Sequence, residues 1–142
     1  MIAMFAGLAF AAMQTAPPDA AWTWTLYTDE ARLALANEVP DTPNLRFTLE
    51  CDPRSGVARV TLYGGQAETA MARVTAGEAS AVTEATAERG GLKMALRTDH
   101  PVFAAFAADG RLAVAVGAQR RTVEVPRPHL AKLRRFAELC SG

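Results

Sequence analysis

The two cysteines, Cys51 and Cys140, are the residues of this sequence whose chemistry is easiest to interpret. Cys51 ends the segment 45–51, in which apolar and polar residues alternate as in a strand with one buried face. Cys140 shares one helical face with the large apolar residues of segment 130–140. Both sulfur atoms are therefore expected to face the core, where they can meet.

A reactive thiol is the alternative interpretation, and the neighbours of both cysteines argue against it. Glu50 and Asp52 flank Cys51, and their charge disfavours a thiolate. Cys140 is expected near a helix C-terminus, where the helix dipole has the same effect. The sequence therefore predicts a structural disulfide, which closes a loop of about 90 residues and stabilises the fold by about 4–5 kcal/mol in the chain-entropy description.

Other residues that commonly catalyse reactions are few and form no recognised motif. His100 and His129 each stand at the expected start of a helix, where capping or a solvated turn explains them. The sequence contains no nucleophile elbow, no P-loop, no dinucleotide fingerprint and no metal-ligand spacing. It thus indicates no catalytic, cofactor-binding or metal-binding residue, and an enzyme would need a site assembled from distant positions.

Charge is balanced overall but uneven along the chain. The 15 basic and 15 acidic side chains cancel, which argues against a nucleic-acid-binding protein. Segment 19–52 has a net charge of −5 and segment 120–142 one of +4. The simpler explanation of this uneven charge is that these side chains face water. The functional explanation is that the C-terminal segment has a basic face that binds an anionic lipid surface or an acidic partner. The basic residues of the expected C-terminal helix and its approach are Arg127, Lys132, Arg134 and Arg135.

Trp22 and Trp24 are the only tryptophans, and they stand two residues apart in an alternating segment. Buried against a sheet they belong to the core, whereas exposed they form an aromatic platform for a ligand or partner. Together with the four cations they make up the candidate binding surface that the sequence suggests.

The N-terminus has the features of an export signal. Residues 1–13 contain no charged or polar side chain, and the run is too short to span a bilayer. Ala9-Phe10-Ala11 fits the small-x-small cleavage pattern, which places the signal at 1–11, or at most to 16. Segment 12–20 is then a flexible mature N-terminus. An uncleaved anchor, or an N-terminal helix or strand buried in the fold, is the alternative.

The remainder, 21–142, is expected to form one β-rich domain. Alternation and turn residues predict seven to nine short strands, with a short helix near 100–108 and a C-terminal helix near 128–140. For 32–37 a short helix is an alternative, and the Ala/Thr/Glu-rich stretch 77–89 is expected to be an edge strand or a solvent-facing segment. The expected strands are 22–27, 32–37, 45–51, 57–63, 71–75, 79–86, 92–97, 111–116 and 121–125. This pattern predicts an antiparallel sandwich or barrel.

Four short features suggest a family likeness: Trp24, the Cys-ending strand 45–51, Phe106-x3-Gly110 before a strand, and Phe136-x3-Cys140. With these features the chain resembles small proteobacterial periplasmic proteins of the invasion-associated locus B kind and the type VI secretion accessory kind. The resemblance implies a periplasmic β-sandwich with an adaptor or envelope role, and it carries over no catalytic residue.

We therefore expect a periplasmic or secreted, non-enzymatic binding or accessory domain that contacts an envelope protein, with no cofactor, no nucleic acid and no transmembrane span after signal cleavage. The alternatives are an envelope enzyme with an unrecognised site and attachment to the envelope surface through the basic C-terminal helix.

Overall fold

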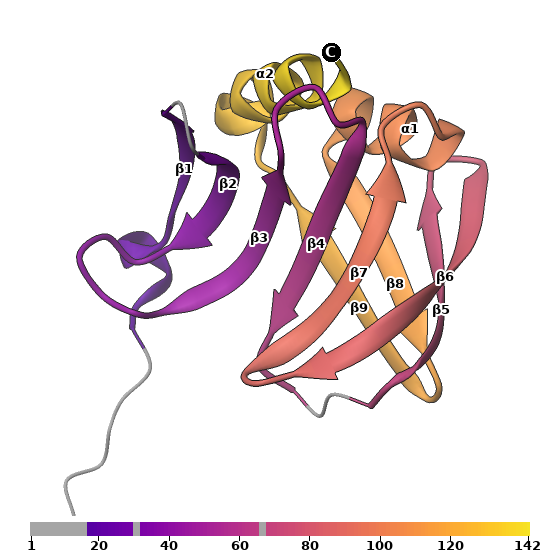
Figure 1. Ribbon diagram of the computed structural model, residues 1–142. Helices are drawn as coiled ribbons and strands as arrows, with labels where there is room; N and C mark the ends of the chain where they lie inside the picture. Colours follow the sequence, from indigo (N-terminus) through magenta and orange to yellow (C-terminus); the bar gives the residue numbers. More distant parts are fainter. Residues whose placement is uncertain (1–16, 30–31, 66–67) are drawn as a thin grey trace, which may run out of the picture.

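The computed structural model describes residues 17–29, 32–65 and 68–142 (Figure 1). The expected signal at 1–11 and its cleavage position lie outside the described residues. The strands are β1 (Thr23–Asp29), β2 (Arg32–Glu38), β3 (Leu45–Cys51), β4 (Val57–Tyr63), β5 (Ala70–Ala76), β6 (Ala79–Glu88), β7 (Gly91–Arg97), β8 (Arg111–Val116) and β9 (Gln119–Glu124). The helices are α1 (Pro101–Asp109) and α2 (Leu130–Ser141), and short 3₁₀ turns occupy Asp19–Ala21 and Arg127–His129.

All the strands belong to one antiparallel sheet, curled into a half-barrel with its concave side around the core. The strand order is β1-β2-β3-β4-β7-β6-β5-β8-β9. The alternation of side chains between the two faces of a strand explains which residues are buried. In β4, the side chains of Ala58, Val60 and Leu62 face the concave side and are at most 1% exposed. The mainly β fold predicted from the sequence is confirmed, with a single curled sheet as its arrangement.

The structure decides between the alternatives that the sequence leaves open for two segments. Segment 32–37 is the predicted strand and not the alternative short helix, because β2 pairs with both β1 and β3. Segment 77–89 is not an edge strand, because β6 pairs with both β5 and β7. Its small Ala and Thr side chains give little apolar signal, yet Ala85 is completely buried on the concave side. A strand can therefore lie inside the sheet order without large apolar residues when a helix packs close to it.

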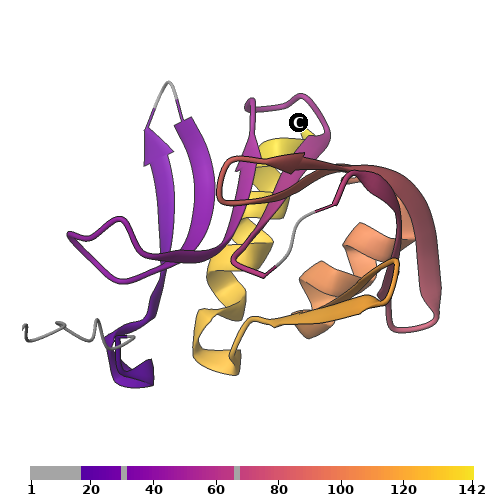
Figure 2. The same ribbon diagram turned by 90° about the horizontal axis from the view of Figure 1, so that it is seen from below.

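Both helices lie on the concave side of the sheet, and α2 occupies the open end of its curve (Figure 2). The Nδ1 atom of His100 accepts the N–H of Val102 and caps α1, which ends at Gly110 with a positive φ of 77°. Phe106 from α1 meets Phe47 from β3 edge to face, with ring centroids 6.3 Å apart. Among the helices that the structure describes, none has the length and apolar character to cross a membrane.

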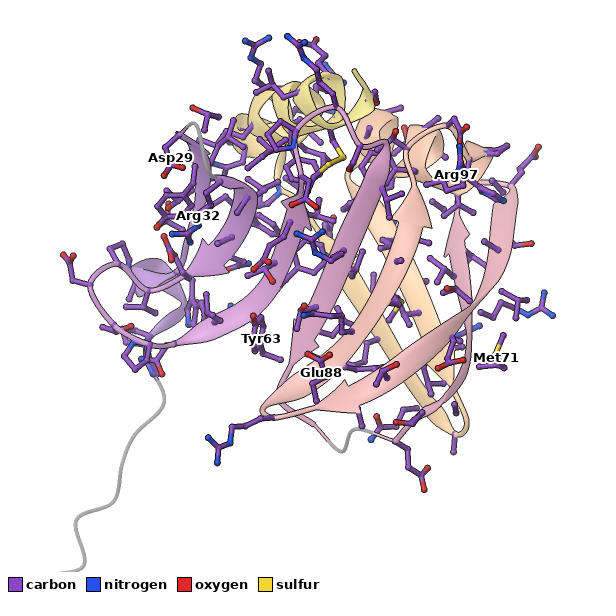
Figure 3. The ribbon with its side chains drawn as sticks, in the orientation of Figure 1. Asp29, Arg32, Tyr63, Met71, Glu88 and Arg97 are labelled. Carbon is purple, nitrogen blue, oxygen red and sulfur yellow. A yellow bond between two sulfur atoms is a disulfide. The ribbon has the colours of Figure 1, made fainter. Side chains whose placement is uncertain are left out.

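The C-terminal end of α2 is fixed to the turn between β3 and β4. The predicted Cys51–Cys140 disulfide is confirmed, and Figure 3 shows it as the yellow bond beside α2. Two backbone hydrogen bonds join the same elements, from Arg54 N to Leu139 O (3.0 Å) and from Gly56 N to Cys140 O (2.8 Å). The helix is thus attached to the sheet by covalent and hydrogen bonds as well as by apolar packing.

Replacing both Cys51 and Cys140 with alanine should lower the free energy of unfolding by about 2–4 kcal/mol, because the loop they close becomes unconstrained in the unfolded chain. Urea unfolding followed by tryptophan fluorescence measures the change. The wild-type protein in reductant is the matched control and should lose a similar amount. An unchanged unfolding midpoint in both samples would contradict this assignment.

Candidate binding cleft

The curled sheet has two edge strands, β1 and β9, and they differ in what covers them. Among the described residues, β9 pairs with β8 alone, so its other edge carries no strand. The β8–β9 hairpin has a two-residue turn, closed by the pair Val116 and Gln119. In such a hairpin the closing pair is hydrogen-bonded, and every second pair after it is too. The backbone N–H and C=O groups of Arg120, Thr122 and Glu124 therefore point away from β8.

The edge of β1 is blocked at one point by a lysine from α2. The Nζ of Lys132 donates to the carbonyl oxygen of Trp24 at 2.6 Å. Covering an edge strand with a helix discourages pairing with another strand. The described part of the chain has no comparable cap on the backbone of β9.

A cleft of about 370 Å³ runs along the unpaired edge of β9 and faces the first four strands. This volume falls within the range of about 300–1,000 Å³ usual for ligand sites. Its apolar lining side chains are each at most 8% exposed in the free protein. The lining residues are Trp24, Asn37, Arg46, Phe47, Leu62, Arg121, Thr122, Val123 and Glu124.

One polar atom in the cleft lacks a hydrogen-bond partner among the described residues. Asn37 follows Leu33 and Leu35 on the concave side of β2, and its Oδ1 atom is buried and unbonded. A buried acceptor without a partner costs about 1–3 kcal/mol. Asn37 is thus a candidate ligand-contacting residue, because a ligand N–H would satisfy this atom.

Arg121 contributes a cation to the lining of the cleft. Its Nη2 donates to Tyr63 O at 2.6 Å and its Nη1 to Gly64 O at 3.2 Å, near the end of β4 where Figure 3 labels Tyr63. Burial lowers the pKa of the Arg121 guanidinium. Within the part of the chain that the structure describes, no carboxylate pairs with Arg121. This positive charge is therefore held in place by neutral carbonyl groups only.

Arg46 contributes a second cation to the cleft and also fixes the chain before β1. Its guanidinium lies over the ring of Trp22, 4.0 Å from the centroid, and its Nη2 pairs with Asp19 at 3.0 Å. Both members of this ion pair are well exposed, so the pair adds little stability. Trp22 is half-buried beneath the arginine, and its buried Nε1 has no partner among the described residues.

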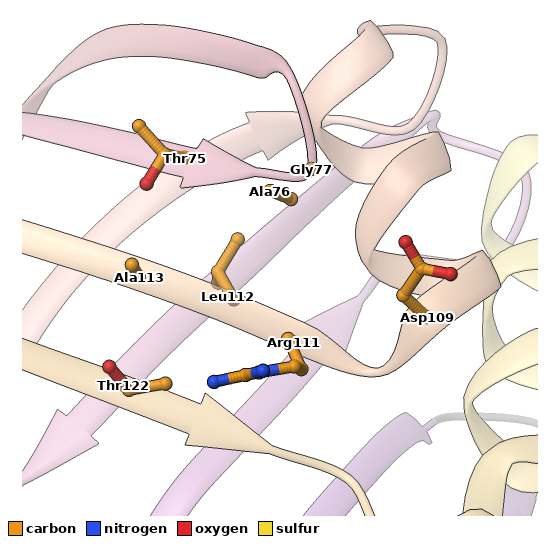
Figure 4. A pocket seen from close by; sticks show the side chains of 8 residues that line it. All are labelled: Thr75, Ala76, Gly77, Asp109, Arg111, Leu112, Ala113 and Thr122. Atoms are coloured by element: carbon orange, nitrogen blue, oxygen red, sulfur yellow. The ribbon is translucent and has the colours of Figure 1, made fainter.

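A second hollow, of about 420 Å³, lies on the outer face of β5, β8 and β9 (Figure 4). Apart from Arg111 and Asp109, its lining consists of short side chains and the buried Leu112. The two charged residues are exposed, so this hollow offers little area that a ligand could desolvate. We regard the cleft along β9 as the better candidate site.

The structure places the tryptophans of the expected binding surface in different settings. Trp24 is 5% exposed and packs against Phe47, with ring centroids 5.7 Å apart. Trp22 precedes β1 and is covered by Arg46. The two rings therefore form no shared exposed platform, and Trp24 reaches the cleft only as part of its wall.

Three of the four cations expected on the C-terminal helix make contacts within the protein. Lys132 bonds to Trp24 O, Arg134 donates to Ala108 O at 3.3 Å, and Arg135 pairs with Glu138 at 3.2 Å. Arg127 is exposed in the 3₁₀ turn before α2. A role for this surface in binding stays a prediction.

The second histidine lies beside Lys132. Its Nδ1 atom is 3.2 Å from the Lys132 Nζ. Burial, with the nearby lysine charge, lowers the pKa of His129 from its ordinary value of 6.5. In the described parts of the chain, no group of three or more His, Cys, Asp or Glu side chains is placed to hold a metal ion.

Comparisons with known proteins give no match for this chain, whether with protein-family models, curated proteins or solved structures.

Replacing Asn37 with leucine should leave the melting temperature unchanged or raise it, because the change removes an unpaired buried acceptor and keeps similar volume. Calorimetry of the variant and wild type measures this effect. Leu35→Asn is the matched control and should be strongly destabilising, because it places a new amide in the core. A clear loss of stability in the Asn37 variant would show that its amide is needed for folding.

Proposed function

We propose that this protein is an exported, non-enzymatic binding domain that holds a protein partner of the cell envelope in the cleft along β9. The observation that carries the proposal is the unpaired edge of β9, which borders a cleft with apolar walls and an unsatisfied Asn37 acceptor. Backbone groups, buried apolar surface and a few oriented polar atoms are the means by which proteins bind other chains.

Export is supported by two features from different parts of the chain. The first 13 residues have the composition of a signal segment. The disulfide joins residues far apart in sequence, and structural disulfides are typical of proteins in oxidising compartments. A periplasmic or secreted location agrees with both features.

The two histidines support a binding role over catalysis. The Nδ1 of His100 is used to cap α1, and the Nδ1 of His129 lies against Lys132. Neither residue lines the cleft along β9. The side chains that do line it can orient and desolvate a partner, and they include no adjacent nucleophile and general base.

Site-specific photocrosslinking in the producing cells tests this proposal. A photoreactive residue in place of Glu124, which lines the cleft, should give one discrete, protease-sensitive product in the envelope or periplasmic fraction. The same residue in place of the exposed Arg73, on the outer face of β5, is the matched control and should give none.

Two results would contradict the proposal. The first is the absence of a product from the cleft position when the protein is fully exported. The second is an identical set of products from the cleft and control positions, because that pattern reports random encounter.

A further inference from the structure

We propose that the occupant of the cleft is an extended peptide segment of the partner, which pairs with β9 as an additional antiparallel strand and places a carboxylate against Arg121. This inference rests on the proposed binding function and specifies its ligand. It follows from three observations: the direction of the free backbone groups, the unpaired charge of Arg121, and the shape of the space beside β9.

The backbone of β9 offers donors and acceptors at the strand spacing on the side of the cleft. Thr122 and Glu124 both line the cleft, and both are positions whose N–H and C=O groups point away from β8. An extended antiparallel peptide can pair with such groups, because it forms two backbone hydrogen bonds with every second residue of β9. A compact small molecule would leave most of them unpaired.

The charge of Arg121 sets the side-chain preference at one position of the peptide. Arg121 and Val123 lie on the concave side, because they are paired with the buried residues Val114 and Leu112 of β8. The Arg121 guanidinium uses two of its donors on carbonyl oxygens and keeps others for a ligand. A carboxylate on the peptide residue opposite Arg121 would supply the missing counter-charge, at a position where burial strengthens the pair.

The antiparallel register also predicts which types of side chain the peptide carries at the neighbouring positions. The peptide residue opposite Val123 also faces inward and should be apolar, since Phe47 and Trp24 form the cleft wall there. The residue opposite Glu124 faces outward and should be basic. Read from its N-terminus, the peptide therefore carries a base, an apolar residue, a small residue opposite Thr122, and then an acid.

A single strand fits this space better than a second copy of the chain. Across the cleft from the open edge of β9 lie residues of the first four strands. Phe47 and Leu62 line the same cleft from β3 and β4. A second whole sheet that continued from β9 would meet these elements, whereas one extended segment would lie between them.

The probe is a fluorescent peptide with the core Lys-Val-Thr-Glu-Thr, titrated against the full protein and followed by fluorescence anisotropy. Methylation of the backbone nitrogen of the first Thr removes the N–H that faces Thr122, so affinity should fall at least tenfold. Methylation of the Glu nitrogen is the matched control, because that N–H points away from β9. It should have a much smaller effect.

Protein variants test the same contacts from the other side. Thr122→Pro removes a free edge N–H without breaking a bond to β8, and it should abolish binding, whereas Thr122→Ala should retain it. Arg121→Gln should weaken binding about 10–100-fold, as expected for the loss of a charge-assisted contact. Arg73→Gln, at an exposed position on the outer face of β5, is the control and should bind as wild type does.

Equal affinity for the charge-reversed peptide Glu-Val-Thr-Lys-Thr, or equal effects of the two N-methylations, would overturn the inference. The wild-type protein serves for both of these tests, so the result does not depend on whether a variant folds. If cleft crosslinking succeeds while the peptide tests fail, only strand addition is wrong. If the peptide tests succeed without a crosslinked cellular partner, strand addition stands and the proposed cellular function is wrong.

Discussion

The position of α2 is set by its attachment to the β3–β4 turn. Cys51–Cys140 and two backbone hydrogen bonds hold the end of the helix, and Leu133 and Phe136 are fully buried on its inner face. With the helix fixed in the open end of the curled sheet, β9 does not pair with β1 to close a barrel. The cleft lies where the sheet stays open, and both edge strands contribute to its lining, β1 through Trp24 and β9 through Arg121 and Val123.

Open sheet edges favour aggregation, and the two edges of this protein are protected in different ways. On β1 the lysine cap at Trp24 occupies a backbone acceptor. On β9 the sequence Gln-Arg-Arg-Thr-Val-Glu places charges beside the free groups and leaves the groups themselves unbonded. Charged side chains repel a strand that carries like charges and attract one that carries opposite charges, so this form of protection is compatible with selective binding.

The sequence predicts the elements well and the site poorly, for physical reasons that particular residues illustrate. The sequence predicts the bounds of β3, β4 and β8 correctly, because large apolar residues alternate in these strands and Gly, Pro or Asp residues end each run. The sequence does not reveal the cleft, because Asn37, Arg121 and Phe47 come together only through the strand order, which alternation does not encode. One local signal was present: Asn37 occupies an inward position after Leu33 and Leu35, where an amide needs an explanation.

Residue-resolved amide hydrogen exchange of the free protein shows whether the edge of β9 is open. If β9 has an open edge while α2 is in place, the amides of Arg120, Thr122 and Glu124 should exchange quickly, whereas those of Arg121 and Val123 should be protected by β8. Protection of all five amides would show that the edge is already paired. That result would contradict the account, since no free strand edge would remain for a partner.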